Sequence, residues 1–181
     1  MTTHLALLRG INLGAKNKIA MPELRSLFED QGHQEVVTYV QSGNVVFQSQ
    51  SSTPKNIAPG IERAISETFG LTVSVILRTR SELKRAVSGN PFLSPGVDFA
   101  SLHVMFLADA PARKAIETLD PDRSQPDEFE IRGREIYLRF PNGSGRSKLT
   151  IDYFERKLGT SATARNWNTV TKVLKLMEER R

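Results

Sequence analysis

The sequence repeats one order of predicted elements, and this repeat limits the folds that the chain can adopt. Each half contains a strand, a helix, a hairpin and a second helix, in that order. Hairpins that alternate with helices in this way are typical of the α+β class. Hydrophobic residues make up 39% and charged residues 25% of the 181 positions, as in an ordinary soluble globular protein.

The first half begins with an apolar strand. Residues 4–9 are nearly all apolar, which is typical of a strand that is covered on both faces. A helix begins near Pro22, and its buried stripe consists of Leu24, Leu27 and Phe28. The clearest hairpin of the chain follows, because residues 42–44 separate two Val-rich stretches and contain Gly and Asn, which tolerate the positive φ of a tight turn.

A second helix is predicted over residues 54–69, where large apolar side chains recur every four positions. A strand over residues 71–78 follows it. Thr79 and Glu82 have the spacing of a capping box and open a short helix that ends near Gly89. The first half is therefore βαββαβ, the order of the ferredoxin-like split βαβ motif.

Residues 90–96 form the best domain boundary, since they hold two prolines and a glycine in a run without helical or strand-like spacing. We divide the chain into a first half, 1–96, and a second half, 97–181, with C-terminal helices. The second half has a strand over 102–107, a helix over 111–119, a hairpin that turns at Gly133, a helix over 150–158, a weak strand over 160–164 and a final helix from about 169. We predict an α+β fold of two ferredoxin-like-related halves with a mostly antiparallel sheet, consistent with a duplication.

The charge of the chain is basic and unevenly spread. Lys and Arg number 25 against 20 Asp and Glu, a net charge of +5, and residues 136–181 alone carry ten basic and four acidic groups. This bias favours anionic partners. The absence of cysteine excludes disulfides and thiolate sites. The start lacks the basic region of a signal peptide and no apolar run has the length of a membrane helix, so we expect a cytoplasmic protein without membrane contact.

The loop after the first strand is one candidate anion site. Its residues Arg9, Asn12, Lys16 and Lys18 accompany two glycines that allow close approach of the backbone, before a predicted helix. It is not a P-loop, because three residues rather than four separate Gly10 from Gly14. The alternative is a solvated loop whose glycines serve only turns.

A second glycine-rich loop, residues 142–148, precedes the helix over 150–158. Backbone N–H groups of such a turn can form a nest for an anion, and here the candidate residues are Gly143, Gly145, Arg146 and Lys148. The alternative is a flexible connector with a serine cap. Because the two loops have the same character, we predict that Lys16, Lys18, Arg146 and Lys148 flank one shared site.

A third candidate is the segment that contains the only tryptophan. Trp167 and Arg165 can stack on a base or a sugar, and Asn166 and Asn168 can make polar contacts. The alternative is a tryptophan that anchors the core, with asparagines that cap the last helix. The apolar spacing of that helix favours a Trp167 that is at least partly buried.

Other sites receive little support from the sequence. The three histidines are far apart and have no carboxylate at ligand spacing, so we predict no metal. No serine lies in the pattern Gly-x-Ser-x-Gly. The best frame for the RNA-recognition signature, residues 132–139, lacks the aromatic stacking positions. No cofactor is expected, and the sequence leaves catalysis and oligomeric state open.

Several of these segments together resemble a bacterial family of unknown function, DUF 1697. They are residues 8–14, 39–45, 90–92, 143–149 and 165–170, in the same order over nearly the whole chain. The resemblance implies two related α+β halves and a cytoplasmic bacterial protein. It implies no reaction, substrate or cofactor.

Two functions follow from the residues. The first is binding of a small phosphorylated or carboxylated ligand at the basic glycine-rich loops, with or without catalysis. The alternative is a nucleic-acid-binding module that uses the basic C-terminal segment, since phosphate contacts supply most of such affinity. A protein with purely structural loops is the third possibility. The local character of the loop signals favours the small anion.

Overall fold

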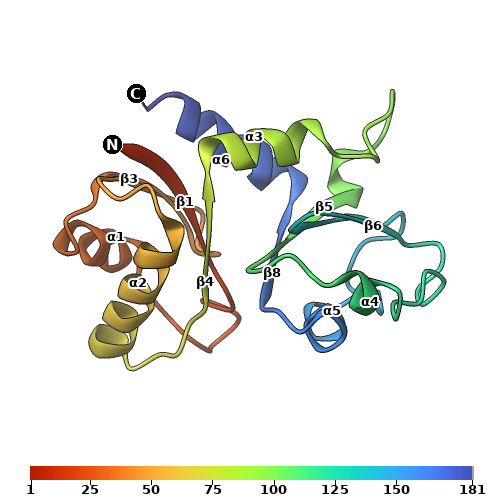
Figure 1. Cartoon of the computed structure of the whole chain (residues 1–181), viewed down its shortest axis with the longest axis horizontal. Helices are drawn as coiled ribbons and strands as arrows, with labels where there is room; N and C mark the ends of the chain where they lie inside the picture. The colour runs from red at the N-terminus through yellow and green to blue at the C-terminus, as the bar shows by residue number, and fades with distance from the viewer. Residues whose placement is uncertain (181) are drawn as a thin grey trace. The chain divides into compact units, whose positions relative to one another are not determined.

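The computed structural model describes residues 1–180 and contains two four-stranded antiparallel sheets. The first half consists of β1 (Thr2–Leu8), α1 (Met21–Asp30), β2 (Gln34–Tyr39), β3 (Asn44–Ser49), α2 (Pro54–Phe69), β4 (Val75–Thr79) and α3 (Arg80–Ser88). The second consists of β5 (Leu102–Leu107), α4 (Arg113–Ile116), β6 (Glu128–Arg132), β7 (Glu135–Arg139), α5 (Ile151–Leu158), β8 (Ala162–Asn166) and α6 (Trp167–Glu178), after a short 3₁₀ turn at Phe99–Ser101. The predicted α+β fold of two similar halves is confirmed (Figure 1).

The two sheets have the same strand order, β2-β3-β1-β4 and β6-β7-β5-β8. The first strand of each half therefore lies second from one edge, between the hairpin and the last strand. The halves do not share a sheet, a point that the sequence left open. The second half has the same βαββαβ order as the first, because the last strand, which the sequence predicted only weakly, is present as β8.

Most predicted elements agree with the structure. In the first half, β4 begins at Val75 rather than at residue 71, and two further differences lie in the second half. The helix predicted over 111–119 is only α4, because Ala112 is extended and none of its residues is buried. The last strand lies two residues further along than predicted, since it follows the register in which Asn166 pairs with His103. The final helix correspondingly begins at Trp167 rather than near Thr169.

Helices α1 and α2 cover one face of the first sheet. The buried stripe of α1, Leu24, Leu27 and Phe28, packs with residues 57, 61 and 65 of α2 and with the inward side chains of the strands. The spacing of four in α2 places its isoleucines on one face, as the sequence predicted. Both faces of β1 are buried, and its residues from Leu5 to Leu8 have no exposed surface.

Helix α3 begins with the capping box that the sequence predicted. Thr79 N donates to the Glu82 carboxylate at 2.8 Å, and Glu82 N donates to the Thr79 hydroxyl at 3.3 Å. Two backbone donors at the helix start are thereby satisfied. In the second half Asn166 caps the start of α6 in the same way, because its Oδ1 accepts a hydrogen bond from Thr169 N at 2.8 Å.

The structure divides into two compact units by internal contacts. One comprises Met1–Arg85 with the chain from Lys172 onward, and the other comprises Ala86–Thr171. Relative to a boundary at residues 96 and 97, residues 86–96 group with the second half and the end of α6 with the first. None of the helices in residues 1–180 combines the length and the apolar character that a membrane-spanning segment requires.

Two polar residues, a histidine and an arginine, recur at equivalent register positions of the two sheets. His4 of β1 pairs with Thr79, and His103 of β5 pairs with Asn166. Thr79 and Asn166 are the residues directly before the third helix of their respective halves. One step further along, Arg78 lies opposite Leu5 and Arg165 lies opposite Val104. Residue identity thus supports the duplication in addition to element order, a signal that the sequence showed only once the strands were aligned by pairing.

Edge strand β2 contains an irregularity. Its register with β3 shifts between Gln34 and Val37, and Glu35 has φ of 50°. The Glu35 carbonyl accepts Nε of Arg180 at 3.2 Å. The first residues of this strand therefore do not continue a straight ladder.

Burial lowers the pKa of His4, His33 and His103 below the ordinary value of about 6.5. As the pH falls below that value, the unfolded chain takes up protons before the folded one does. The free energy of unfolding should therefore reach its maximal histidine contribution above about pH 6.5 and decrease toward pH 5. Denaturant midpoints for the wild type and His103→Gln at each pH test this, since the variant should lose less stability over the same range. An identical pH dependence of the two proteins would contradict the assignment for His103.

Candidate anion-binding site

The loop after β1 is fixed by its own polar groups. Asn12 N donates to Asn17 O at 2.9 Å, and the Asn17 side chain donates to Gly10 O at 3.0 Å. All three residues have positive φ, a conformation that Gly adopts freely and Asn more readily than most residues. The sequence of the loop thus serves its turns, as the structural alternative requires.

Asn12, predicted to contact the anion, is engaged within the protein. Its side-chain amide donates to Ile19 O at 3.0 Å and to Gln41 O at 2.8 Å, and its Oδ1 accepts Ile19 N at 2.9 Å. Both amide hydrogens are therefore used to close the loop and to join it to the turn between β2 and β3. The side chains that remain at the surface are Lys16 and Lys18, which are exposed, and Arg9, which is half-buried.

The second loop, residues 142–148, is called the basic loop below. All of its residues are exposed except Ser147, which is half-buried. Gly143, with φ of 81°, reverses the chain and donates its N–H to Phe140 O at 3.0 Å. Ser147 N donates back to Ser144 O at 3.2 Å, so the middle of the basic loop forms a tight turn.

The middle of this turn presents unused backbone donors. Within residues 1–180, the N–H groups of Ser144, Gly145 and Arg146 have no hydrogen-bond partner. Successive N–H groups of a turn attract anions because each carries partial positive charge. The side chains of Arg146 and Lys148 form no ion pair in the same part of the chain. The turn therefore combines free donors with two uncompensated cations.

A neighbouring segment holds the end of the basic loop. Arg123 Nε donates to Lys148 O at 2.9 Å, and Lys148 N donates to the Ser124 hydroxyl at 3.0 Å. The Arg123 guanidinium lies over the Tyr153 ring, 4.0 Å from its centroid. The sequence gives no local signal for Arg123, because it lies in a stretch dominated by aspartates, twenty-five positions before its partner Lys148.

Arg123 adds a third positive charge to the basic loop. The Tyr153 ring beneath it is held in turn, since its hydroxyl accepts Asp120 N at 3.0 Å. Cation–π contact and one hydrogen bond restrict the guanidinium, so less entropy is lost when it binds a ligand. The nearest carboxylate in the hydrogen-bond chain is Asp127, which accepts the Ser124 hydroxyl at 2.8 Å.

The helix start of α5 is not part of the free donor set. Thr150 is its cap, and the Thr150 hydroxyl accepts Tyr153 N at 3.2 Å. The cap is thus a threonine two residues beyond the basic loop, not the serine of the structural alternative. Any anion at the basic loop would be bound by the turn and its side chains rather than by this helix.

The tryptophan segment has a structural setting. Trp167 is 2% exposed, which confirms the expected burial at the start of the last helix. Arg165 is also buried and donates to the Thr163 hydroxyl at 2.7 Å and to Ala164 O at 2.8 Å. Burial lowers the pKa of Arg165 to about 10, so the guanidinium remains charged at neutral pH. Asn166 and Asn168 are exposed, and Asn166 caps α6.

The comparisons with known proteins agree with this architecture. A family model described as "Protein of unknown function (DUF1697)" matches residues 1–137. The chain belongs to this family. No curated protein matches it significantly. A solved structure of the conserved bacterial protein SP0830 from Streptococcus pneumoniae is similar, with 22% sequence identity and a TM-score of 0.72, over 97% of this chain and 98% of that one. At this identity the similarity concerns the fold.

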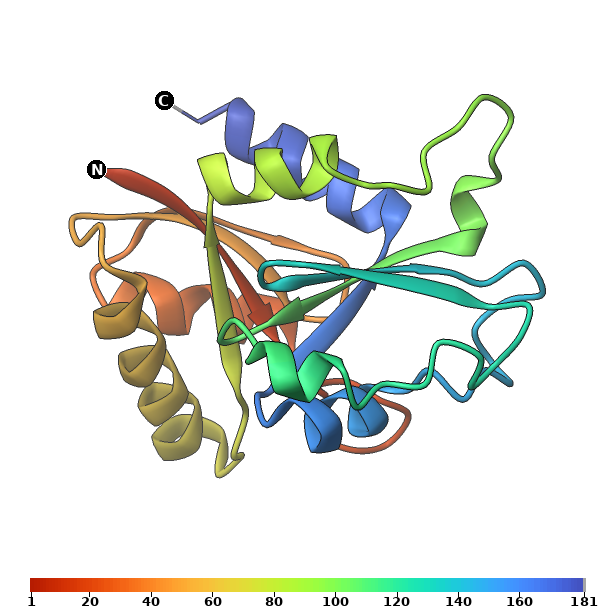
Figure 2. The ribbon, with the colours of Figure 1, turned by 45° about the vertical axis from the view of Figure 1, so that its right-hand side comes forward.

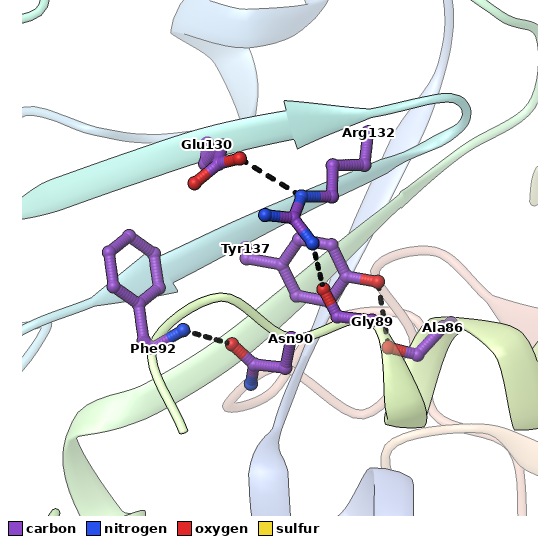
Figure 3. Close-up of polar contacts among 7 residues, drawn as sticks. All are labelled: Ala86, Gly89, Asn90, Phe92, Glu130, Arg132 and Tyr137. Carbon is purple, nitrogen blue, oxygen red and sulfur yellow. Dashed lines mark hydrogen bonds and ion pairs between the residues drawn. The ribbon is translucent and has the colours of Figure 1, made fainter. Parts of the chain in front are cut away.

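The segment that resembles the family at residues 90–92 is an anchored turn of the DUF1697 chain (Figure 3). Arg132 donates to Gly89 O at 2.8 Å, and the Tyr137 hydroxyl donates to Ala86 O at 2.7 Å. Burial raises the pKa of Tyr137 to about 12, so the hydroxyl remains a donor. The Asn90 Oδ1 accepts Phe92 N at 3.0 Å. These contacts fix the exit from α3 and add no charged group to the basic loop.

No group of three or more histidines or carboxylates in residues 1–180 is placed to hold a metal ion. The aspartates and glutamates of residues 120–130 lie at the surface or half-buried, as a solvated loop and strand face would. The DUF1697 chain therefore offers cations and backbone donors at its candidate site, and no arrangement for metal chemistry among the described residues.

Gly43, in the family segment over residues 39–45, has a structural role, because the backbone there packs closely against its neighbours. It has φ of +82°, and a Cβ there would lie 2.8 Å from the Leu8 Cβ and 2.9 Å from a carbon of Ile11. Gly10 has φ of +72° and no atom within 4 Å of the corresponding position. Gly10→Ala should cost about 1–2 kcal/mol of unfolding free energy for its left-handed backbone, and Gly43→Ala about 1–3 kcal/mol more for the overpacking. Equal midpoints in urea for the two variants would contradict the close packing at Gly43.

Trp167→Ala should lower the free energy of unfolding by about 3–5 kcal/mol, because a large buried side chain is removed. Binding of ligands to the folded protein should change little in comparison. Chemical denaturation measures the first quantity and calorimetric titration the second. A variant of unchanged stability with reduced ligand affinity would instead support the predicted stacking role of Trp167.

Proposed function

We propose that the protein binds a small phosphorylated or carboxylated anion at the basic loop. The observation that carries the proposal is the coincidence, in one exposed turn, of three unused backbone N–H groups with the unpaired cations Arg146 and Lys148. Such a turn costs electrostatic repulsion while it is empty, and an anion removes that cost.

The arrangement suits an oxyanion with several acceptor oxygens. Ser144, Gly145 and Arg146 offer N–H groups, which contribute directional hydrogen bonds. The Arg146 guanidinium can bind two oxygens of one phosphate or carboxylate, and Lys148 supplies a point charge. Arg123, held over Tyr153 and bonded to Lys148 O, is the third cation beside the basic loop. The proposal concerns binding, and no acid–base pair is assigned to a reaction.

Two predictions from the sequence extend this proposal. Lys16 and Lys18 are expected to contribute to the same ligand, and Lys16→Ala/Lys18→Ala tests their share of the affinity. The alternative ligand is nucleic acid, which would bind the same cations through its phosphates. That alternative requires an affinity that falls steeply with salt, because each neutralised phosphate releases counterions.

Phosphate should raise the melting temperature of the wild type in a concentration-dependent manner, since a ligand of the native state stabilises it by mass action. Arg146→Ala/Lys148→Ala should abolish most of that rise. Arg156→Ala/Lys157→Ala is the matched control, because it removes two exposed cations of α5 in the same unit. Thermal shift with phosphate, sugar phosphates, nucleotides and dicarboxylates measures the effect and ranks the ligand classes.

Equal loss of the phosphate effect in the two double variants would contradict a defined site and leave only general attraction by positive charge. An absence of any shift with all four ligand classes would also contradict the proposal. Binding to random single-stranded RNA, with a steep salt dependence and no small-anion effect, would favour the nucleic-acid alternative.

A further inference from the structure

A groove runs between α1 and α2 of the first unit. Its volume is about 430 Å³, within the range of ligand sites in proteins. One wall is formed by positions 22–23, 26–27 and 30 of α1 together with Gln31 just after it, and the other by positions 64 and 67–69 of α2. Figure 2 shows the two helices side by side over the same sheet.

The floor of the groove is apolar and its rim is acidic. Leu27 and Ala64 are buried, and Phe69 is half-buried beside them. The charged residues of the lining are Glu23, Asp30 and Glu67, which are all exposed, and the lining contains no Lys or Arg. The Gln31 side chain reaches toward α2, since its Oε1 lies 3.9 Å from the position of a Cβ at Gly60. The groove thus separates an apolar strip from three negative charges.

The three rim carboxylates are uncompensated. Within residues 1–180, neither Glu23, Asp30 nor Glu67 forms an ion pair or a side-chain hydrogen bond. Arg25, a basic residue of α1, already forms an ion pair with Glu29, with Nε 2.9 Å from the carboxylate oxygen. The negative charge of this rim is opposite in sign to the net charge of the whole chain, which is +5.

The spacing of the charges excludes the simplest cationic ligand. The described residues contain no group of carboxylates that is placed to share one metal ion. A ligand that compensates all three charges must therefore carry several separated cations. It must also cover the apolar floor, which a fully hydrated ion does not do.

We propose that this groove is a docking site for a basic peptide segment of a partner protein, with Lys or Arg side chains at Glu23, Asp30 and Glu67 and one apolar side chain on the floor between the helices. Charge complementarity selects the partner and orients it, while the buried apolar anchor supplies affinity. This inference is independent of the anion site, which lies in the other unit and has the opposite charge.

The test is fluorescence anisotropy of the full chain with a short labelled peptide of alternating Lys and Leu. Two comparison peptides replace Leu with Ser or Lys with Glu. We expect measurable affinity for the Lys/Leu peptide alone, and weaker binding as salt is added, because exposed ion pairs are screened.

Rim and floor variants identify the binding surface. Glu23→Gln/Asp30→Asn/Glu67→Gln should weaken binding by about tenfold, as expected for three partly exposed charge pairs. The matched control, Asp109→Asn/Glu178→Gln/Glu179→Gln, changes the net charge equally at exposed positions outside the groove. Ser26→Phe fills the groove without altering charge and should abolish binding, whereas Ser66→Phe, exposed on α2 outside the lining, should not.

Several results would overturn the proposal. Equal weakening by the two triple variants would show attraction by overall charge, and equal affinity for the Lys/Ser peptide would show that the floor contributes nothing. Equal affinity for spermine would assign the groove to small polyamines instead. Absence of binding by the Lys/Leu peptide would exclude this partner class, while the phosphate experiment on the basic loop would remain unaffected.

Discussion

The pairing of one central strand on both of its edges is the constraint on which each half of this protein depends. β1 is hydrogen-bonded to β3 on one side and to β4 on the other, and β5 has the same place between β7 and β8. Because both edges are used and both faces are covered, only short apolar runs fit these positions. The first loop leaves directly from β1, and the second half places β7, which leads into the basic loop, beside β5. The candidate anion site is thus positioned by a strand that contributes no residue to it.

Local signals predicted much of this fold from the sequence. The repeat of four in α2, the capping box at Thr79 and Glu82, and the glycine turns of both hairpins each rest on contacts within a few residues. The errors arose where tertiary pairing decides. α4 is short because no buried stripe supports a longer helix, and β8 is defined by its register with β5 rather than by β propensity. Shared polar residues such as His4 and His103 became recognisable only through that register.

For the candidate sites too, local sequence patterns reveal the residue types but not the contacts between distant segments. The glycine-rich and basic character of residues 142–148 is visible in the sequence, and so is the possibility that Trp167 is buried. The tie from Arg123 to Lys148, the internal use of Asn12 and the groove between α1 and α2 are not, because each joins side chains from separate segments. About forty positions separate the two helical faces that line the groove. No local pattern specifies which helix faces will meet.

The irregular start of β2 has a consequence for the behaviour of the protein in concentrated solution. A straight edge strand offers a row of unpaired N–H and C=O groups on which another chain can add a strand. The register shift between Gln34 and Val37 interrupts that row, and Arg180 occupies the Glu35 carbonyl. The edge is therefore a poor template for intermolecular sheet growth, and Arg180, which follows α6, contributes to keeping separate molecules apart.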